Sequence, residues 1–455
     1  MDAFPAQDSL LPHGDHVKTR RVVRRRKQKK EESLITALCS WIVEHQIGLA
    51  INLVLLLSLT HICFPRARPH TRKFFEMAYY NPDTQAYTRG IDDMYLVFFW
   101  IVAFTGLRMG SMEYLLQPFA QWGGIESKKA RTRFAEQGWM VMYDSVFWSL
   151  GMYLMYKSDY WFNLKALWEG YPPIHMSGTM KWYYLVQFAF WLQQLFVVNI
   201  EERRKDFWQM FTHHIFTCAL LFASYGWYQH KVGNVILCTM DVVDILLPLA
   251  KMFNYLGLRT LCDVTFGIFI TVWFVTRHIF YPLVCRAIYV DLPVLGCYDS
   301  ITGAKIEGEE NTSIWSNISQ PFTRPGGHVC FNDNIRLLFL GMLLALQVLM
   351  ILWFVMISRL ACSVIMGKVA EDPRSDDEGE DSYEEFEIDD HFDAEWDEEH
   401  AIEEEVGVEG LSARPKGGPS GRRGKRPVAR TSAISIPGHG DHKELLGRIG
   451  CDKPS

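Results

Sequence analysis

Long apolar blocks alternate with polar segments along most of the chain. Each block is close to the roughly 20 residues that a helix needs to cross a bilayer. The pattern predicts an all-α, polytopic membrane protein with about eight transmembrane helices. We place these helices at residues 40–64, 93–116, 137–156, 180–200, 207–228, 232–254, 261–284 and 334–361.

Basic residues gather on one side of this predicted bundle. The N-terminal tail, the loop 127–133, the segment 201–205 and the junction 251–259 all fall on that side when the helices are counted. Cytosolic loops are enriched in Lys and Arg, so this side, with both termini, is predicted to face the cytosol. Segment 64–73 is also basic but falls on the other side.

The long polar segment 285–332 falls on the opposite, lumenal side. It carries two N-glycosylation sequons, at Asn311 and Asn317, which are candidate sites of modification there. It also carries Cys297 and Cys330, a candidate disulfide in an oxidising lumen.

Charge is strongly segregated, although the formal net charge is only −6. Residues 18–30 contain nine Lys or Arg, whereas residues 371–405 hold 20 of the 52 acidic residues. Neither segment can bury a core, so both are predicted to be disordered tails. Within the acidic tail, Ser375 and Ser382 are followed by carboxylates and are candidate phosphorylation sites. We expect no cleavable signal peptide, because the first apolar segment starts too far into the chain and is too long.

Ionisable residues interrupt two neighbouring apolar blocks. His213 and His214 lie about two turns into the fifth predicted helix, and Asp241 and Asp244 share one face of the sixth. A tight turn makes the two helices antiparallel neighbours, so the four side chains are predicted to meet inside the membrane. Charged groups there cost roughly 2.5–3.5 kcal/mol each even on lenient scales, and they usually mark functional sites. A single histidine is more often a packing residue, but the set of four favours function.

This set supports a definite range of chemistry. An imidazole can remove a proton from an amine or alcohol while a carboxylate orients it, or it can itself accept an acyl group. Thr217, one turn further on, more typically bonds its own helix than acts as a nucleophile. Adjacent histidines point about 100° apart on a helix, so we expect no metal.

The segments RRKDFWQMFTHHIFTCALLFASY and VGNVILCTMDVVDILLPLAKMFNYLG closely resemble the signature of eukaryotic ceramide synthases of the TLC membrane-domain family. The resemblance covers about 120–365, with Pro248 where the family often has Glu, and it looks most like the fungal branch. The polar landmarks that match are Arg204, Lys205, Asp206, His213, His214, Ser224, Tyr225, Gly233, Asp241, Asp244, Lys251, Asn254 and Tyr255.

The resemblance implies a helical barrel around an intramembrane cavity in which a sphingoid base is N-acylated by a fatty acyl-CoA, in the endoplasmic reticulum. His213, His214, Asp241 and Asp244 are its catalytic candidates, with acyl-CoA as co-substrate and no cofactor. It also implies a homodimer or a heterodimer with a paralogue, a small single-span regulatory subunit and no nucleic-acid partner. The candidate substrate-binding residues are Arg203, Arg204, Lys205, Ser224, Tyr225, Lys251, Asn254, Tyr143, Asp144 and Arg277. The implied organisation is a basic tail (1–35), two helices with a lumenal loop (36–119), the TLC catalytic domain (120–365) and an acidic then basic tail (366–455).

Four competing interpretations stay open. The basic residues near the cytosolic mouth are explained by topology alone as well as by contact with CoA phosphates. Asp144 and Arg277 could form a structural ion pair, which we favour over a role in substrate binding. A proton-coupled transporter would also place His and Asp in mid-membrane, but no internal repeat is visible in the sequence. A non-catalytic TLC protein, either lipid-sensing or translocon-associated, would share the fold but is expected to lack the HH and DxxD set.

Overall fold

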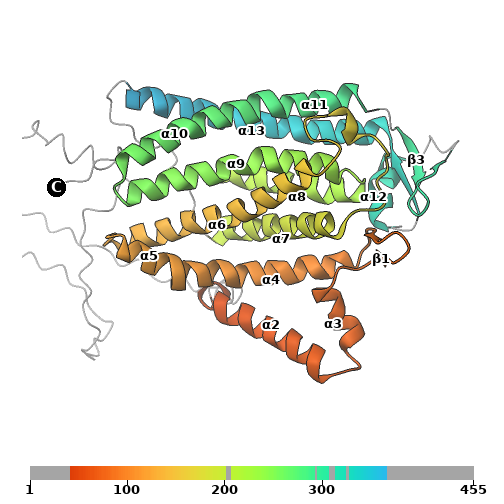
Figure 1. The fold of residues 1–455 in the computed structure, drawn as a ribbon, viewed down its shortest axis with the longest axis horizontal. Coiled ribbons are helices and arrows are strands. Elements are labelled where there is room, and N and C mark those ends of the chain that lie inside the picture. The colour runs from red at the N-terminus through yellow and green to blue at the C-terminus, as the bar shows by residue number, and fades with distance from the viewer. Residues whose placement is uncertain (1–40, 201–205, 293–294, 307–312, 324–326, 366–455) are drawn as a thin grey trace, which may run out of the picture.

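A computed structural model describes residues 41–200, 206–292, 295–306, 313–323 and 327–365, and these residues form a bundle of long helices (Figure 1). The helices are α2 (Gln46–Cys63), α3 (Arg68–Phe75), α4 (Asp93–Ser111), α5 (Gln117–Trp122), α6 (Lys128–Tyr156), α7 (Gly178–Ile200), α8 (Phe207–Gly226), α9 (His230–Tyr255), α10 (Arg259–Phe274), α11 (Tyr281–Val290), α12 (Ile314–Thr323) and α13 (Asp333–Ile365). A π-helical turn η1 (Met112–Leu116) joins α4 to α5, another, η3 (Val275–Phe280), joins α10 to α11, and a short 3₁₀ turn η2 (Lys165–Leu167) precedes α7.

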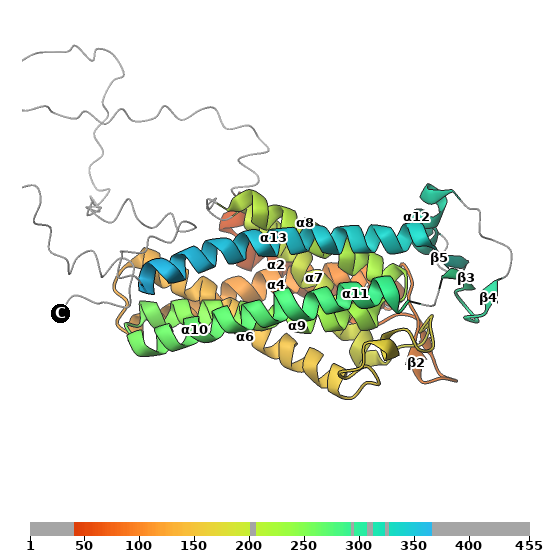
Figure 2. The ribbon, with the colours of Figure 1, turned by 90° about the horizontal axis from the view of Figure 1, so that it is seen from above.

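The two ends of the bundle differ. The α5–α6 and α9–α10 connections and the end of α13 lie at one end, whereas the small strands and α12 lie at the other (Figures 1 and 2). Ser127 caps α6 by accepting a hydrogen bond from the Ala130 amide. Gly257 adopts a φ of 71°, the left-handed conformation that ends a helix, and so lets the chain turn from α9 into α10. We call this end, which carries the basic loops, the basic end, and the other the sheet end.

Every predicted transmembrane segment forms a helix, but not all are equally apolar. Five stretches are long and apolar enough to cross a membrane: Gln46–Cys63, Asp93–Trp122, His230–Tyr255, Arg259–Val290 and Asp333–Cys362. The remaining three predicted segments correspond to α6, α7 and α8, whose polar side chains lower their hydropathy. The chain is therefore a mostly helical, multi-pass membrane protein.

The sheet end contains two small antiparallel sheets that an all-α expectation did not include. Strands β1 (Tyr80–Asn81) and β2 (Ala86–Tyr87) form one, and strands β3 (Gly296–Asp299), β4 (Lys305–Ile306) and β5 (His328–Phe331) form the other in the order β4-β3-β5. They lie in the loops between helices. Strands of two to four residues are too short to show a periodic pattern of apolar and polar residues in the sequence.

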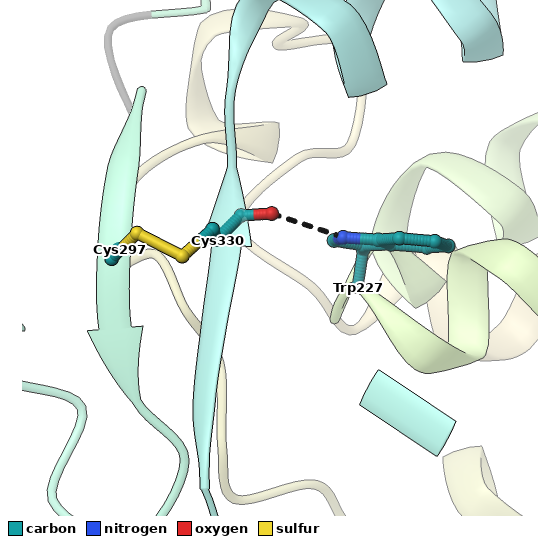
Figure 3. Close-up of a disulfide and its surroundings, with 3 residues drawn as sticks. All are labelled: Trp227, Cys297 and Cys330. Carbon is teal, nitrogen blue, oxygen red and sulfur yellow. Dashed lines mark hydrogen bonds between the residues drawn. A yellow bond between two sulfur atoms is a disulfide. The ribbon is translucent and has the colours of Figure 1, made fainter. Parts of the chain in front are cut away.

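A disulfide ties the second sheet together and a hydrogen bond joins it to the bundle. Cys297 and Cys330 lie opposite each other on β3 and β5 and are bonded through sulfur (Figure 3). The indole Nε1–H of Trp227, at the end of α8, donates to the carbonyl oxygen of Cys330 at 3.2 Å (Figure 3). The sheet is thereby anchored to the helix that carries the two histidines.

A buried ion pair joins α4 to α7. Lys181 Nζ lies 2.7 Å from Asp93 Oδ1, and neither side chain has appreciable exposure. The ammonium also donates to the carbonyl oxygens of Ala78 and Thr88, at 2.8 and 2.7 Å. Tyr225 of α8 donates to Asp93 Oδ2 at 2.6 Å, so three helices meet at this point.

Replacing Lys181 by Met is expected to destabilise the protein strongly, because it leaves the Asp93 carboxylate buried without its partner. Breaking a buried pair on one side typically costs about 3–5 kcal/mol, whereas replacing both partners is often nearly neutral. Thermal unfolding of the detergent-solubilised protein measures the effect. The double variant Lys181→Met/Asp93→Leu should recover much of the lost stability, and a single variant as stable as the wild type would contradict this account.

Candidate functional site

A cavity of about 310 Å³ runs through the helical bundle between α6, α7, α8, α9, α13 and the α10–η3–α11 helix. Its lining changes character along its length. Arg133, Asp206, Lys251 and Tyr255, at the basic end of the bundle, line one part of it. Aromatic and aliphatic side chains line the part near the sheet end, namely Trp168, Ile288, Leu292, Phe331, Phe339 and Leu343.

The histidine pair lies on the wall of this cavity between the two parts. His214 is buried, and its Nδ1–H donates to the Met210 carbonyl oxygen at 2.7 Å, since a carbonyl can only accept. In the neutral ring, this bond places the proton on Nδ1 and leaves Nε2 with its lone pair. His213 packs edge-on against Trp353, and its Nδ1 has no hydrogen-bond partner within the described part of the chain. Trp191 also packs on the His214 ring.

Asp241 is held by a relay of hydrogen bonds from two other helices. Its Oδ2 accepts from Gln187 Nε2 of α7 at 3.0 Å, and Gln187 Oε1 accepts from the Tyr143 hydroxyl of α6 at 2.8 Å. Asp241 Oδ1 has no hydrogen-bond partner among the described residues. The carboxylate lines the same cavity as both histidines, oriented by a neutral amide.

Asp244 faces a guanidinium. Arg277 Nη2 lies 3.9 Å from Asp244 Oδ1 and donates to the Met240 carbonyl at 3.0 Å, and its guanidinium lies over the Trp273 ring. Arg277 lies in the π-helical turn η3, a kind of irregularity that is frequent at functional sites. Because η3 packs against α9, the guanidinium of Arg277 reaches Asp244.

The expected ion pair between Asp144 and Arg277 is therefore wrong. Asp144 is buried on α6, does not line the cavity, and leaves Oδ2 without a hydrogen-bond partner in the described residues. The sequence does not show which helix Arg277 of η3 faces, and the structure pairs it with Asp244 of α9 instead. Tyr143 also stays outside the cavity and acts through Gln187.

The other substrate-binding candidates separate into two groups. Ser224 and Lys251 line the cavity, and the Ser224 hydroxyl is hydrogen-bonded to Tyr184. Tyr225 instead binds Asp93, and Asn254 is exposed outside the cavity. The remaining candidates Arg203, Arg204, Lys205, Asn311, Ser375 and Ser382 lie outside the described residues, and Asn317 lies in α12.

Sequence reasoning missed several parts of the site. Gln187 stands alone as a polar side chain in the apolar run YYLVQFAF, and that interruption was a usable signal. No sequence signal indicated the Met210 carbonyl or the aromatic contacts of Trp191 and Trp353, because these interactions depend on how the chain folds and packs. No hydrogen bond between either histidine and either aspartate is present within the described residues, so the expected direct orientation of an imidazole by Asp241 or Asp244 is not seen in this state.

The side chains that line the cavity include the groups that proton transfer or acyl transfer needs. In the described ranges, no group of three or more His, Cys, Asp or Glu side chains is placed to hold a metal ion. The available groups are an oriented neutral imidazole, a second imidazole with an unpartnered nitrogen and two carboxylates. Together they can accept a proton, balance the resulting imidazolium or carry an acyl group.

Fold and site together define a multi-pass membrane protein with a histidine-bearing centre in a cavity that is polar at one end and apolar at the other. This is the construction expected of a membrane enzyme that works on long-chain lipids.

The family model described as the TLC domain matches residues 133–359. The sphingosine N-acyltransferase-like protein ALT7 of Alternaria alternata is 46% identical over 346 residues, covering 75% of this chain and 77% of that protein. The ceramide synthase FUM18 of Gibberella moniliformis is 40% identical over 71% of this chain and 76% of its own length, and the sphingosine N-acyltransferase lag1 of Schizosaccharomyces pombe is 39% identical over 71% and 79%. The chain belongs to the ceramide synthase family of TLC-domain proteins.

Proposed function

We propose that the protein is a ceramide synthase, which transfers a fatty acyl group from acyl-CoA to the amine of a sphingoid base and forms dihydro- or phytoceramide. One observation carries this proposal: both histidines and both aspartates line a single cavity that continues into an apolar end. Relatives named for this activity align with most of the chain, whereas a non-catalytic TLC protein has no need of such a set.

The lining of the cavity suggests where each substrate lies. The apolar part near Phe331 and Phe339 suits an acyl chain, whose burial contributes roughly 0.8 kcal/mol per CH₂ group. The CoA phosphates belong at the other end, near Arg133 and Lys251. This placement brings the thioester between the two ends, beside the histidines.

In the direct route, His214 acts as the general base. Its Nε2 accepts the proton of the attacking amine as the new C–N bond forms, and collapse of the tetrahedral intermediate breaks the C–S bond. The imidazolium returns that proton to the departing sulfur, so CoA leaves as its thiol. Asp241 and Asp244 balance the transient imidazolium, and the Met210 carbonyl keeps the imidazole in the required tautomer.

A two-step route uses the same groups. One imidazole, for which His213 is a candidate because it lines the cavity, attacks the thioester carbon, and CoA leaves as the thiol with the proton of that ring. The amine then attacks the carbonyl carbon of the acyl-imidazole, the bond from this carbon to the ring nitrogen breaks, and the imidazole takes the proton that the amine loses. Mass measurement of the protein after acyl-CoA is added without the sphingoid base separates the routes, because only the second leaves an acylated protein.

We also propose eight membrane-spanning helices that form a barrel around the cavity, in the endoplasmic reticulum membrane with both termini in the cytosol. The basic residues that flank the α5–α6 and α9–α10 connections at the basic end, and the position of α12 with Asn317 at the sheet end, support this topology. A dimer and a small single-span subunit remain expectations from the family resemblance. Gel mobility of the wild type, with and without glycosidase, and of the Asn311→Gln and Asn317→Gln variants tests this topology. If the wild type carries no glycan at either site, the evidence that this loop is lumenal is lost.

Purified protein given a mixture of acyl-CoAs and sphingoid bases is expected to release free CoA and to form ceramides in equal amounts. This measurement identifies the reaction and the preferred acyl chain together. Release of CoA without amide would indicate thioester hydrolysis, and no turnover with any pair would contradict the proposed function.

A further inference from the structure

A second, smaller cavity of about 70 Å³ lies beside the catalytic one, between the start of α4 and the helices α7 and α8. It lies at the sheet end, because Arg89 in its wall connects β2 to α4 (Figure 1). Tyr184 and Leu221 line both cavities and thus separate them. The catalytic reaction proposed above makes no use of this second space.

Arg89 gives the second cavity an unbalanced charge. Its side chain is only 7% exposed, its Nη1 donates a long bond of 3.4 Å to the Tyr225 carbonyl, and its guanidinium lies 3.9 Å from the Tyr228 ring centre. Nε and Nη2 have no hydrogen-bond partner in the described part of the chain. A buried guanidinium with unused donors is unfavourable unless an anion joins it.

The nearest carboxylate of the cavity wall is already committed. Asp93 is paired with Lys181, and it accepts further hydrogen bonds from the Tyr225 hydroxyl and the Gly90 amide. It therefore neutralises Lys181 rather than Arg89. Among the described residues no carboxylate is therefore left to pair with Arg89, and a bound anion would supply the missing counter-charge.

The rest of the lining shows what kind of anion fits. Leu185, Phe188 and Leu221 are apolar, and Phe222 of α8, which also lines the cavity, is 39% exposed. A free inorganic anion makes no favourable contact with this apolar surface, whereas the acyl chain of an amphiphile does. The small volume favours a headgroup with little beyond its phosphate.

We propose that this cavity binds an anionic phospholipid from the leaflet at the sheet end. Its phosphate accepts hydrogen bonds from the Arg89 Nε and Nη2 donors, a forked geometry that guanidinium groups offer to phosphates. The start of an acyl chain lies between α7 and α8, against Phe188 and Phe222. The bound lipid supports the wall formed by Tyr184 and Leu221 from outside the catalytic cavity, and its binding does not depend on the proposed acyl transfer.

The test uses the full-length, delipidated protein with phosphatidylcholine as the reference lipid. Adding phosphatidic acid is expected to raise the unfolding temperature and to leave bound phosphatidic acid detectable by native mass spectrometry. Arg89→Gln should weaken retention on the order of ten-fold or more, as loss of a charge-assisted pair of hydrogen bonds predicts. Arg72→Gln is the matched control, because Arg72 is an exposed arginine on α3 near the same end and should retain the lipid as the wild type does.

Three results would overturn the proposal. They are equal retention of phosphatidic acid and phosphatidylcholine by the wild type, undiminished retention by a folded Arg89→Gln protein, and equal stabilisation by inorganic phosphate alone, which would indicate a free-anion site. If Arg89→Gln does not fold, the comparison of the two lipids and inorganic phosphate on the wild-type protein decides.

Discussion

Substituting Ala for His213 or His214 is expected to reduce ceramide formation by at least about 100-fold, the lower end of what general base catalysis contributes. Both rings lie on the wall of the cavity, and no other side chain of the described wall offers a neutral imidazole in their place. Product formation is measured by mass spectrometry on purified protein with saturating acyl-CoA and sphingoid base. Loss of His214 removes the oriented base, and loss of His213 removes the unpartnered imidazole.

The matched control is Ile215→Ala, which alters the next residue of the same helix on its outward face, where Ile215 is 43% exposed. This variant should retain near wild-type activity. The histidine variants should elute from size exclusion as the wild type does, so that lost activity is not lost folding. A folded His213→Ala or His214→Ala protein with full activity would contradict the assignment.

Asp241→Asn is expected to lower activity by roughly 10²-fold or more, the scale seen when a preorganised electrostatic group is removed from an active site. The substitution keeps the shape and the contact with Gln187 but removes the charge that balances an imidazolium. Turnover at saturating substrate should fall more than apparent substrate affinity, because the charge matters in the transition state.

The double variant Asp241→Asn/His214→Ala tests whether the two groups act as one unit. If the carboxylate works through the imidazole, the double variant should be no less active than His214→Ala alone. Fully multiplicative losses would show that Asp241 acts independently of His214. Wild-type activity in Asp241→Asn would remove the aspartate from the mechanism.

The helical framework was readable from sequence because bilayer-spanning helices need long apolar runs, and those runs dominate this chain. The two His and two Asp were conspicuous for the same reason, since ionisable residues are rare in such runs. The tight turn between α8 and α9 led us to expect that these side chains meet, although no hydrogen bond joins either histidine to either aspartate within the described residues. The structure places all four on one cavity wall.

Other parts of the site depend on contacts that sequence spacing does not encode. The partner of Arg277 is Asp244 because η3 packs against α9, and nothing near Arg277 in the sequence indicates that choice. The hydrogen bond from His214 to Met210 involves a backbone carbonyl, which every residue has. The sheet of order β4-β3-β5 is built from short strands that are separated in the sequence, so it also has no local sequence signature.

The central claim, that acyl transfer takes place at the histidine pair inside the cavity, is tested most directly by a structure of the protein with a thioether analogue of a long-chain acyl-CoA. We expect the carbon that replaces the thioester carbonyl to lie within about 3.5 Å of a ring nitrogen of His213 or His214, the distance of a near-attack geometry. We also expect the acyl chain to extend toward Phe331 and Phe339 and the nucleotide to lie near Arg133 and Lys251. An acyl chain that lies outside this cavity, or a reacting carbon far from both imidazoles, would contradict the claim.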